Sequence, residues 1–229
     1  MIQTILFDLD DTLLDFHRSE AVAISETLAH LGITPTDAIL TRYSAINLSH
    51  WERLERGEIS RNQVLTGRFS VLFGDLGVNR SPDEAQRHYE HQLSLQHFFL
   101  PGGKALLDQL KDAYTLVIIS NGTATVQDRR IQDAGLIPYF KHIFISQRLG
   151  YDKPQKAFFD ACFARMPGVK REECLIVGDS LTSDMLGGRN AGIPTCWYNP
   201  HGKPRRADIP VDYEIHRLEE LPELLKKIP

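Results

Sequence analysis

The chain has 229 residues, of which 42% are hydrophobic and 24% are charged, and its formal net charge is −4. This length and composition are typical of a globular protein with a sizeable hydrophobic core, and they exclude a disordered or collagen-like chain. A slight acidic excess lacks the clustered Lys and Arg that bind a nucleic acid polymer. We therefore expect a small-molecule ligand and no nucleic acid polymer.

The cysteines and the apolar runs indicate the compartment. Cys162, Cys174 and Cys196 form no C-x-x-C pair and leave an odd thiol, so neither a disulfide framework nor a zinc site is indicated. Residues 2–7 are apolar but have no basic flank, unlike a signal peptide. No uninterrupted apolar stretch approaches the roughly 18 to 20 residues of a membrane span. A cytoplasmic protein without a membrane partner is expected.

Short apolar runs rich in β-branched residues predict buried strands. They lie at 2–7, 115–119, 142–145, 174–177 and 194–197, and helices are expected near 103–111, 123–134, 155–165 and 183–191. A turn-rich loop at 199–204 precedes a last short strand and a C-terminal helix. Strands and helices that alternate at this spacing predict a doubly wound, Rossmann-like α/β core with a parallel sheet, formed by residues 1–15 and 98–229.

Residues 16–97 have helical periodicity and few strand signals. Helix-start signals occur at Thr36-Asp37, at Ser60 and at Ser81-Pro82-Asp83. This stretch follows the first strand directly, so it would overhang the carboxyl ends of the strands, where open α/β sheets bind ligands. We expect an all-helical cap inserted after the first strand.

Paired carboxylates follow two of the predicted strands. Asp8 and Asp10 come at the end of the first strand, where alternation would point both the same way. Asp179 and Asp184 follow the strand at 174–177. Because a parallel sheet gathers the carboxyl ends of its strands at one edge, we expect all four to converge. Oxygen ligands of this kind favour Mg²⁺ over zinc, although acidic caps of turns and helices would give similar patterns.

Two further strand ends carry groups that suit an anion. Ser120-Asn121-Gly122 closes the strand at 115–119, where a hydroxyl and loop N–H groups can surround a phosphate. Lys153 follows the strand at 142–145 and would neutralise both a phosphate and the carboxylates. Asn-Gly is also an ordinary turn signal, and a Lys-Pro pair is usually a surface linker. The inference of a phosphate site depends on all four strand ends occurring together in this order, because each signal alone is weak.

This set resembles the four motifs of the haloacid dehalogenase-like (HAD) hydrolase superfamily: Asp8-Leu9-Asp10, Ser120, Lys153, and Gly178-Asp179 with Asp184. A closer resemblance is to the noncanonical pyrimidine 5′-nucleotidases of that superfamily. It rests on Ser120-Asn121-Gly122 followed by Gln127 and Arg130, and on residues 183–192 leading to Thr195-Cys196-Trp197. Asp152, directly before Lys153, is an acidic neighbour that this resemblance does not account for.

The resemblance implies a Mg²⁺-dependent phosphate monoester hydrolase, with one ion per active site. Asp8 would be the nucleophile that forms an aspartyl-phosphate, and Asp10 the proton shuttle. Ser120, Asn121 and Lys153 would bind the phosphoryl group. Asp8, Asp10 through its backbone carbonyl, Asp179 and Asp184 would hold the metal.

The cap would select the substrate, which we expect to be a pyrimidine nucleoside monophosphate. Phe16, His17, Arg18, His50 and Trp51 are candidates for contacting its base or sugar, although aromatic residues at helical spacing are more often packing residues. The alternatives are a phosphatase of small sugar phosphates or phosphoglycolate, a phosphomutase, and a non-catalytic binding module. A carbon–halogen hydrolase would not need Asp10. Either a monomer or a homodimer is compatible with the sequence.

Overall fold

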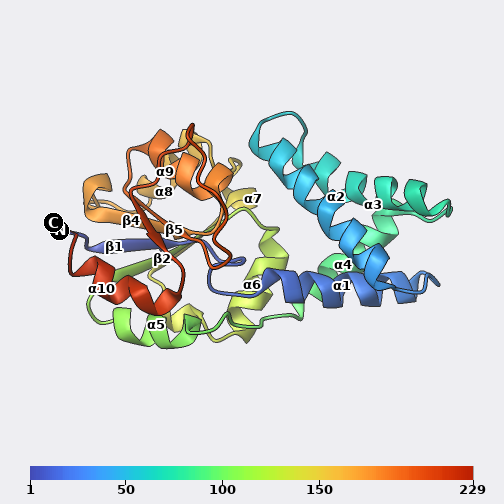
Figure 1. Ribbon diagram of the computed structural model, residues 1–229, viewed down its shortest axis with the longest axis horizontal. Helices are drawn as coiled ribbons and strands as arrows, with labels where there is room; N and C mark the ends of the chain where they lie inside the picture. The colour runs from blue at the N-terminus through green and yellow to red at the C-terminus, as the bar shows by residue number, and fades with distance from the viewer. Residues whose placement is uncertain (229) are drawn as a thin grey trace. The chain divides into compact units, whose positions relative to one another are not determined.

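The computed structural model describes residues 1–228 (Figure 1). It contains two compact units, and each is described by itself. The core unit comprises Met1–Asp15 and the residues from Phe98 onward, and the helical unit comprises Phe16–His97. The chain therefore leaves the core unit after its first strand and returns to it 82 residues later, so the core is discontinuous in sequence.

A single parallel sheet forms the centre of the core unit. Its strands are β1 (Thr4–Phe7), β2 (Thr115–Ser120), β3 (His142–Ile145), β4 (Cys174–Gly178), β5 (Thr195–Tyr198) and β6 (Tyr213–Ile215). They lie in the order β3-β2-β1-β4-β5-β6, and every pair is parallel. β1 is thus an inner strand, flanked by β2 and β4. The prediction of a doubly wound α/β core is confirmed, with strand bounds that differ by at most two residues.

Helices lie between these strands, and the last helix follows β6. They are α5 (Gly103–Leu110), α6 (Ala124–Asp133), α7 (Ser146–Leu149), α8 (Lys156–Phe163), α9 (Leu186–Ala191) and α10 (Leu221–Leu225), with short 3-10 turns η1 (Ile137–Tyr139), η2 (Arg171–Glu173) and η4 (Leu218–Glu220). The helix predicted at 183–191 is divided into a π-helical turn, η3 (Leu181–Met185), and α9. Single π turns of this kind occur frequently at functional sites, and this one carries Asp184.

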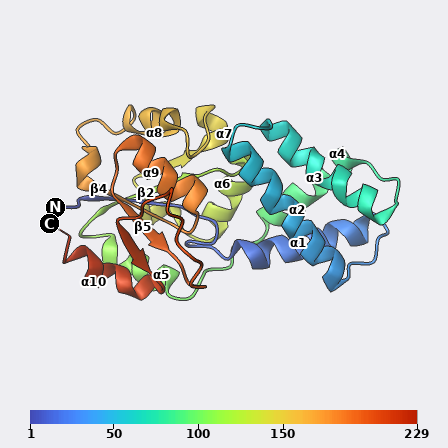
Figure 2. The same ribbon diagram turned by 45° about the horizontal axis from the view of Figure 1, so that its top comes forward.

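Alternate residues of the inner strands face two hydrophobic clusters. Ile5 and Phe7 belong to the cluster that includes α5, α6 and α10 side chains, whereas Leu6 belongs to the cluster with α8 and α9. Figure 2 shows α8 and α9 above the sheet and α5 and α10 below it. Because both faces are covered, all four residues of β1 are buried, and its end is held rigidly.

The helical unit consists of four helices. They are α1 (Phe16–His30), α2 (Asp37–Glu55), α3 (Arg61–Leu76) and α4 (Pro82–Ser94). The predicted start signals at Thr36, Ser60 and Ser81 are confirmed, because each side chain accepts a hydrogen bond from a backbone N–H in the first turn of its helix. At Ser60 the reciprocal bond from Gln63 completes a capping box.

A buried cation holds this unit together. The Arg68 guanidinium donates to Asn47 Oδ1 (2.6 Å) and to Gln86 Oε1 (2.7 Å), and Asn47 Nδ2 donates to Glu20 (2.6 Å). The three hydrogen bonds tie the four helices to one another around the guanidinium. Among residues 1–228, no helix is both long and apolar enough to cross a membrane.

Candidate active site

The carboxyl end of β1 places Asp8 in the interior of the core unit. β1 pairs with β2 on one side and with β4 on the other, and the pairing with β4 extends to Asp8, whose N–H donates to Val177 O (2.9 Å). The carboxylate of Asp8 is nearly buried, with 7% of the residue exposed. Asp8 is therefore fixed at the edge of the sheet where the ends of β2 and β4 also lie.

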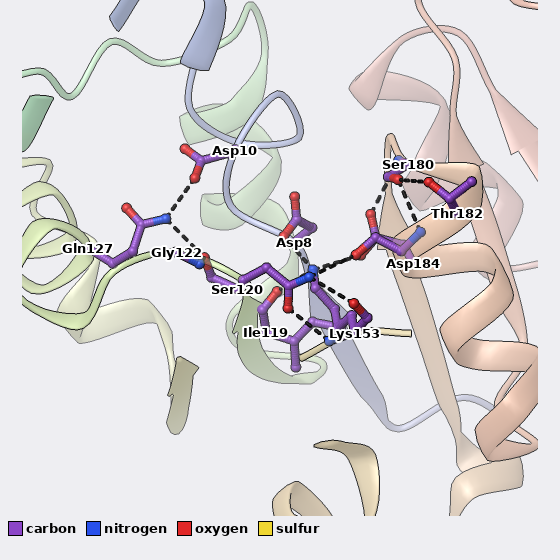
Figure 3. A network of polar contacts seen from close by, with 12 residues as sticks. Asp8, Asp10, Ile119, Ser120, Gly122, Gln127, Lys153, Ser180, Thr182 and Asp184 are labelled. Carbon is purple, nitrogen blue, oxygen red and sulfur yellow. Dashed lines mark hydrogen bonds and ion pairs between the residues drawn. The ribbon is translucent and has the colours of Figure 1, made fainter. Parts of the chain in front are cut away.

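Asp10 lies in a turn instead of extending the strand. β1 ends at Phe7, Asp11 adopts the left-handed conformation with φ 54°, and Leu13 and Leu14 both donate backbone hydrogen bonds to Leu9 O. Strand alternation therefore does not extend to Asp10. Its side chain turns toward α6, whereas Asp8 faces Lys153 (Figure 3). The expectation that both carboxylates point the same way is therefore wrong: Asp8 points toward Lys153 and Asp10 toward α6.

Lys153 lies at the centre of the buried charges. Its ammonium donates to Asp8 Oδ1 (2.6 Å), to Asp184 Oδ1 (2.7 Å) and to Ile119 O (2.9 Å), which uses all three N–H bonds. Burial lowers the pKa of Lys153, but the carboxylates of Asp184 and Asp8 outweigh burial, and the net shift is upward. The lysine is therefore a permanent cation between two aspartates.

Asp184 is held by the loop that follows β4. Its Oδ2 accepts the N–H of Ser180 (3.2 Å), while Ser180 Oγ accepts the N–H of Ser183 and caps the π turn. The carboxylate also lies against Gly178, where a Cβ would overlap it. A glycine at the end of β4 thus gives Asp184 the space to reach the lysine. The helix cap in this loop is Ser180, not Asp179.

The aspartates raise one another's pKa values. Burial raises the pKa of Asp8 to about 8, with Lys153 opposing the shift and Asp184 and Asp10 adding to it. Loss of surrounding water also raises the pKa of Asp179 well above its usual range, with Asp11 and Asp8 adding to the shift. Three carboxylates, those of Asp8, Asp179 and Asp184, thus share this buried cluster with one ammonium, that of Lys153.

The donor set of this cluster fits a hard divalent cation. Carboxylate oxygens of Asp8, Asp179 and Asp184 lie within 4.8 Å of one another. All three ligands are oxygens, which suits Mg²⁺, and a dication would offset the excess negative charge. The side chain of Asp10 is outside this group because it faces α6, so only its backbone carbonyl remains available for the ligand role expected of it.

Ser120 and Asn121 follow β2. Ser120 Oγ accepts hydrogen bonds from Gly122 N–H (3.1 Å) and from Gln127 Nε2 (2.9 Å). Asn121 spans the backbone of Lys153, because its Nδ2 donates to Lys153 O and its Oδ1 accepts from Lys153 N–H, both at 2.9 Å. The Asn121 amide therefore ties the Lys153 loop to the end of β2.

Two residues on α6 contact Asp10, and no site role was predicted for them. Gln127 Nε2 donates to Asp10 Oδ2 (2.6 Å), and Arg130 Nη1 forms an ion pair with Asp10 Oδ1. Gln127 and Arg130 are buried, at 1% and 0% exposure. A polar pair spaced three residues apart, on the helix face that carries Val126 and Ile131, is the signal that could have identified them.

The candidate substrate residues belong to the helical unit. Phe16, His17 and Arg18 form the first turn of α1, with His17 and Arg18 exposed. Trp51 lies in α2 and is partly exposed, with the Arg61 guanidinium 5.5 Å from its ring centre. His50 is buried and its Nδ1 bonds to Ile46 O (2.8 Å) within the same helix, so packing accounts for it.

The sequence and the fold agree on a family. Residues 2–192 match the model of the haloacid dehalogenase-like hydrolases. The chain belongs to this family. It is a hydrolase with the α/β fold described above, and the resemblance seen in its motifs is confirmed.

Relatives cover nearly the whole chain. The crystal structure of the HAD-hydrolase YfnB from Bacillus subtilis, bound to magnesium, is 38% identical and covers 98% of each chain with a TM-score of 0.94. The pyrimidine 5′-nucleotidase PynA of Streptococcus pneumoniae is 37% identical over 97% of this chain and 94% of its own. The pyrimidine 5′-nucleotidase YjjG of Escherichia coli is 31% identical over 97% of each chain.

Proposed function

We propose that this protein is a Mg²⁺-dependent phosphatase that hydrolyses pyrimidine nucleoside 5′-monophosphates through an aspartyl-phosphate. The main support for this reaction type is that Asp8 and Asp10 have different hydrogen-bond partners. Asp8 lies beside a buried ammonium and two further carboxylates, and Asp10 lies apart from that cluster. One carboxylate is thus available for attack and the other for proton transfer.

In the first step, an oxygen of Asp8 attacks phosphorus and the bond from phosphorus to the ester oxygen breaks. Asp10 gives its proton to the leaving alcohol. Lys153 offsets negative charge at Asp8, which is needed because an anion attacks an anion. A magnesium ion held by Asp8, Asp179, Asp184 and the carbonyl of Asp10 would supply the remaining positive charge.

In the second step, water attacks the phosphorus of the aspartyl-phosphate and releases inorganic phosphate and the free Asp8 carboxylate. Asp10, now ionised, takes the proton of that water and returns to its starting form. Ser120 supports both steps by donating its hydroxyl to a phosphoryl oxygen. Asn121 contributes by fixing the backbone of Lys153.

The substrate class rests on the relatives. PynA and YjjG are both named as pyrimidine 5′-nucleotidases and align with almost the full chain, including the segment that forms the helical unit. We propose that the helical unit acts as a cap that selects the substrate. The residues that would contact the nucleoside are Phe16, His17, Arg18 and Trp51. The buried core of this unit, organised around Arg68, would give such a cap a defined shape.

The test is phosphate release from a panel of nucleoside monophosphates and sugar phosphates, with Mg²⁺ or with EDTA, for the wild type and Asp8→Asn. Release that needs Mg²⁺, disappears in Asp8→Asn and is fastest for dUMP or dTMP supports the full proposal. Release from sugar phosphates alone would support the aspartyl-phosphate mechanism and reject nucleoside monophosphates as the substrate class. No release from any substrate rejects the phosphatase in favour of a mutase or a binding module.

A further inference from the structure

The amide of Gln127 is fully used in hydrogen bonds. Its Nε2 donates to Asp10 Oδ2 (2.6 Å) and to Ser120 Oγ (2.9 Å), and its Oε1 accepts from Arg130 Nη1 (2.9 Å). A primary amide has two N–H bonds, so both are committed. This side chain therefore joins the proposed proton shuttle to the proposed phosphate-binding hydroxyl.

Arg130 contacts both Asp10 and Gln127. Its Nη1 pairs with Asp10 Oδ1 and also donates to Gln127 Oε1. Both oxygens of the Asp10 carboxylate thus have a partner on α6, one from each residue, and each oxygen keeps a second lone pair that can carry the transferred proton. Because Ile131 of α6 belongs to the same hydrophobic cluster as Ile5 and Phe7 of β1, the helix is a rigid support for the carboxylate.

The hydrogen-bond count at Ser120 fixes the direction of its hydroxyl. Ser120 Oγ accepts from Gly122 N–H and from Gln127 Nε2, and a hydroxyl oxygen has two lone pairs. Its own O–H is therefore left to donate. A hydroxyl that donates is what a phosphoryl oxygen requires, so Gln127 orients Ser120 as well as Asp10.

Gly122 makes this arrangement possible. A Cβ at this position would lie 2.5 Å from Cγ and Nε2 of Gln127, closer than atoms can approach. The Gln127 side chain crosses the backbone of Gly122 on its way to Ser120 and Asp10. A glycine in the loop after β2 is thus required by the path of the glutamine, which links the Ser120-Asn121-Gly122 motif to the residues on α6.

We propose that Gln127 and Arg130 are positioning residues that hold the Asp10 carboxylate for proton transfer to the leaving group, while Gln127 turns the Ser120 hydroxyl toward the phosphoryl group. This inference rests on the proposed phosphatase function. It adds a specific role for α6, which lies wholly within the core unit.

The test uses two small aryl esters that differ in how much they need a proton donor. p-Nitrophenyl phosphate has a good leaving group that departs without protonation, whereas phenyl phosphate has a poor one. The value of kcat/KM reports transfer of the phosphoryl group to Asp8, and kcat also includes hydrolysis of the aspartyl-phosphate. Wild type, Asp10→Asn, Gln127→Met, Arg130→Met and Gly122→Ala are compared with Mg²⁺ present.

For Gln127→Met, we expect kcat/KM for phenyl phosphate to fall at least about tenfold, a part of the factor of 10² to 10⁴ typical of acid–base catalysis. For p-nitrophenyl phosphate, kcat/KM should fall by less than about threefold, because this ester loses only the support that Gln127 gives to Ser120, whose bond from Gly122 N–H remains. Its kcat should fall further, because the hydrolysis step still needs Asp10. Arg130→Met should show the same pattern, because it removes the partner of Asp10 Oδ1. Gly122→Ala should show it too, because it displaces Gln127 without removing a polar group.

Matched controls lie on the solvent side of the same helix. Gln132 and Arg129 are exposed, and Gln132→Met and Arg129→Met should leave both esters unchanged. Circular dichroism and the melting temperature establish that each variant is folded. Should Gln127→Met fail to fold, Gly122→Ala decides the matter with the same two esters.

Losses of equal size on both esters would indicate a merely structural role and overturn the inference, as would no loss on either. If Asp10→Asn shows the leaving-group pattern and the folded α6 variants do not, the inference is wrong and the proposed function stands. If the wild type hydrolyses neither ester nor any nucleotide, both are wrong.

Discussion

The ammonium of Lys153 lies 2.6 Å from Asp8 Oδ1 in the interior of the core unit. The same group is 2.7 Å from Asp184, and the side chains of Lys153 and Asp184 are nearly inaccessible to water. A buried cation between two carboxylates is costly to remove, because each anion then stays buried without a partner.

Lys153→Met should therefore destabilise the protein by about 3–5 kcal/mol, and it should reduce phosphatase activity by more than about a hundredfold. Chemical denaturation and phosphate release would measure the two effects. Lys156 is an exposed lysine paired with Asp160 on the surface, so Lys156→Met should cost less than about 1 kcal/mol. A Lys153→Met protein as stable as Lys156→Met would contradict this account of the charge cluster.

Magnesium should stabilise the folded protein through Asp179 and Asp184. An ion that binds only the native state raises the melting temperature, by an amount that grows with concentration above the dissociation constant. We expect Mg²⁺ to raise the melting temperature of the wild type but to have much less effect on Asp179→Asn or Asp184→Asn. Asp112 is exposed in the loop after α5, and Asp112→Asn should respond to Mg²⁺ as the wild type does. An equal response from all the variants would exclude this site.

Gly178→Ala should disturb the site through Asp184 alone. The added Cβ would overlap the Asp184 carboxylate, and overpacking of this kind typically costs about 1–3 kcal/mol. We expect weaker Mg²⁺ binding and a clear loss of activity, measured by titration of phosphate release against Mg²⁺. Gly74 offers a matched control, since a Cβ there meets open space in α3, and Gly74→Ala should stabilise by about 0.5–1 kcal/mol. Unchanged Mg²⁺ dependence in Gly178→Ala would contradict the prediction.

The helical unit should lose stability in acid through a pair of histidines. His30 and His88 stack with ring centres 4.2 Å apart, with Glu84 beside His30 and Thr27 bonded to His88. Burial lowers the pKa of His88 below its ordinary 6.5, with His30 and His91 adding to the shift and Glu26 and Glu84 opposing it.

The folded state thus favours neutral His88, so its contribution to stability is present above pH 6.5 and is lost as the pH falls below that value. The melting temperature, followed by circular dichroism between pH 7.5 and roughly pH 5, should drop less in His88→Gln than in the wild type. His201 is an exposed histidine of the core unit, and His201→Gln should behave as the wild type. A larger drop of the melting temperature in His88→Gln than in the wild type would contradict the predicted direction of the pH dependence.

Much of the core unit could be predicted from the sequence, because buried parallel strands are continuous apolar runs. The runs around Leu6, Val117 and Ile176 were sufficient to predict neighbouring strands, and the carboxyl ends of such strands must share one edge. That argument brought Asp8, Lys153 and Asp184 to the same place, where the structure also has them. The catalytic roles of these residues remain proposals.

The contacts of Asp10 could not be predicted, because they depend on one backbone conformation. β1 ends at Phe7 and Asp11 takes a left-handed φ that is ordinarily typical of glycine, so strand alternation does not extend to Asp10. The resulting turn directs Asp10 toward Gln127 and Arg130, more than a hundred residues later in the chain. The π turn at Leu181–Met185 is equally hidden, since its sequence reads as the start of an ordinary helix.

The position of β1 in the sheet has a consequence for biosynthesis. Thr4 lies opposite Thr115 on one side and opposite Cys174 on the other, so the strand that leaves the ribosome first has its last partner made about 170 residues later. At roughly 5–20 residues per second, that delay is on the order of 10–30 s. Through this interval β1, which leads to Asp8, lacks at least one of the two strands that flank it in the sheet. Asp8 also cannot meet Asp184 before that residue is made, so no nascent chain that ends before Asp184 carries the assembled site.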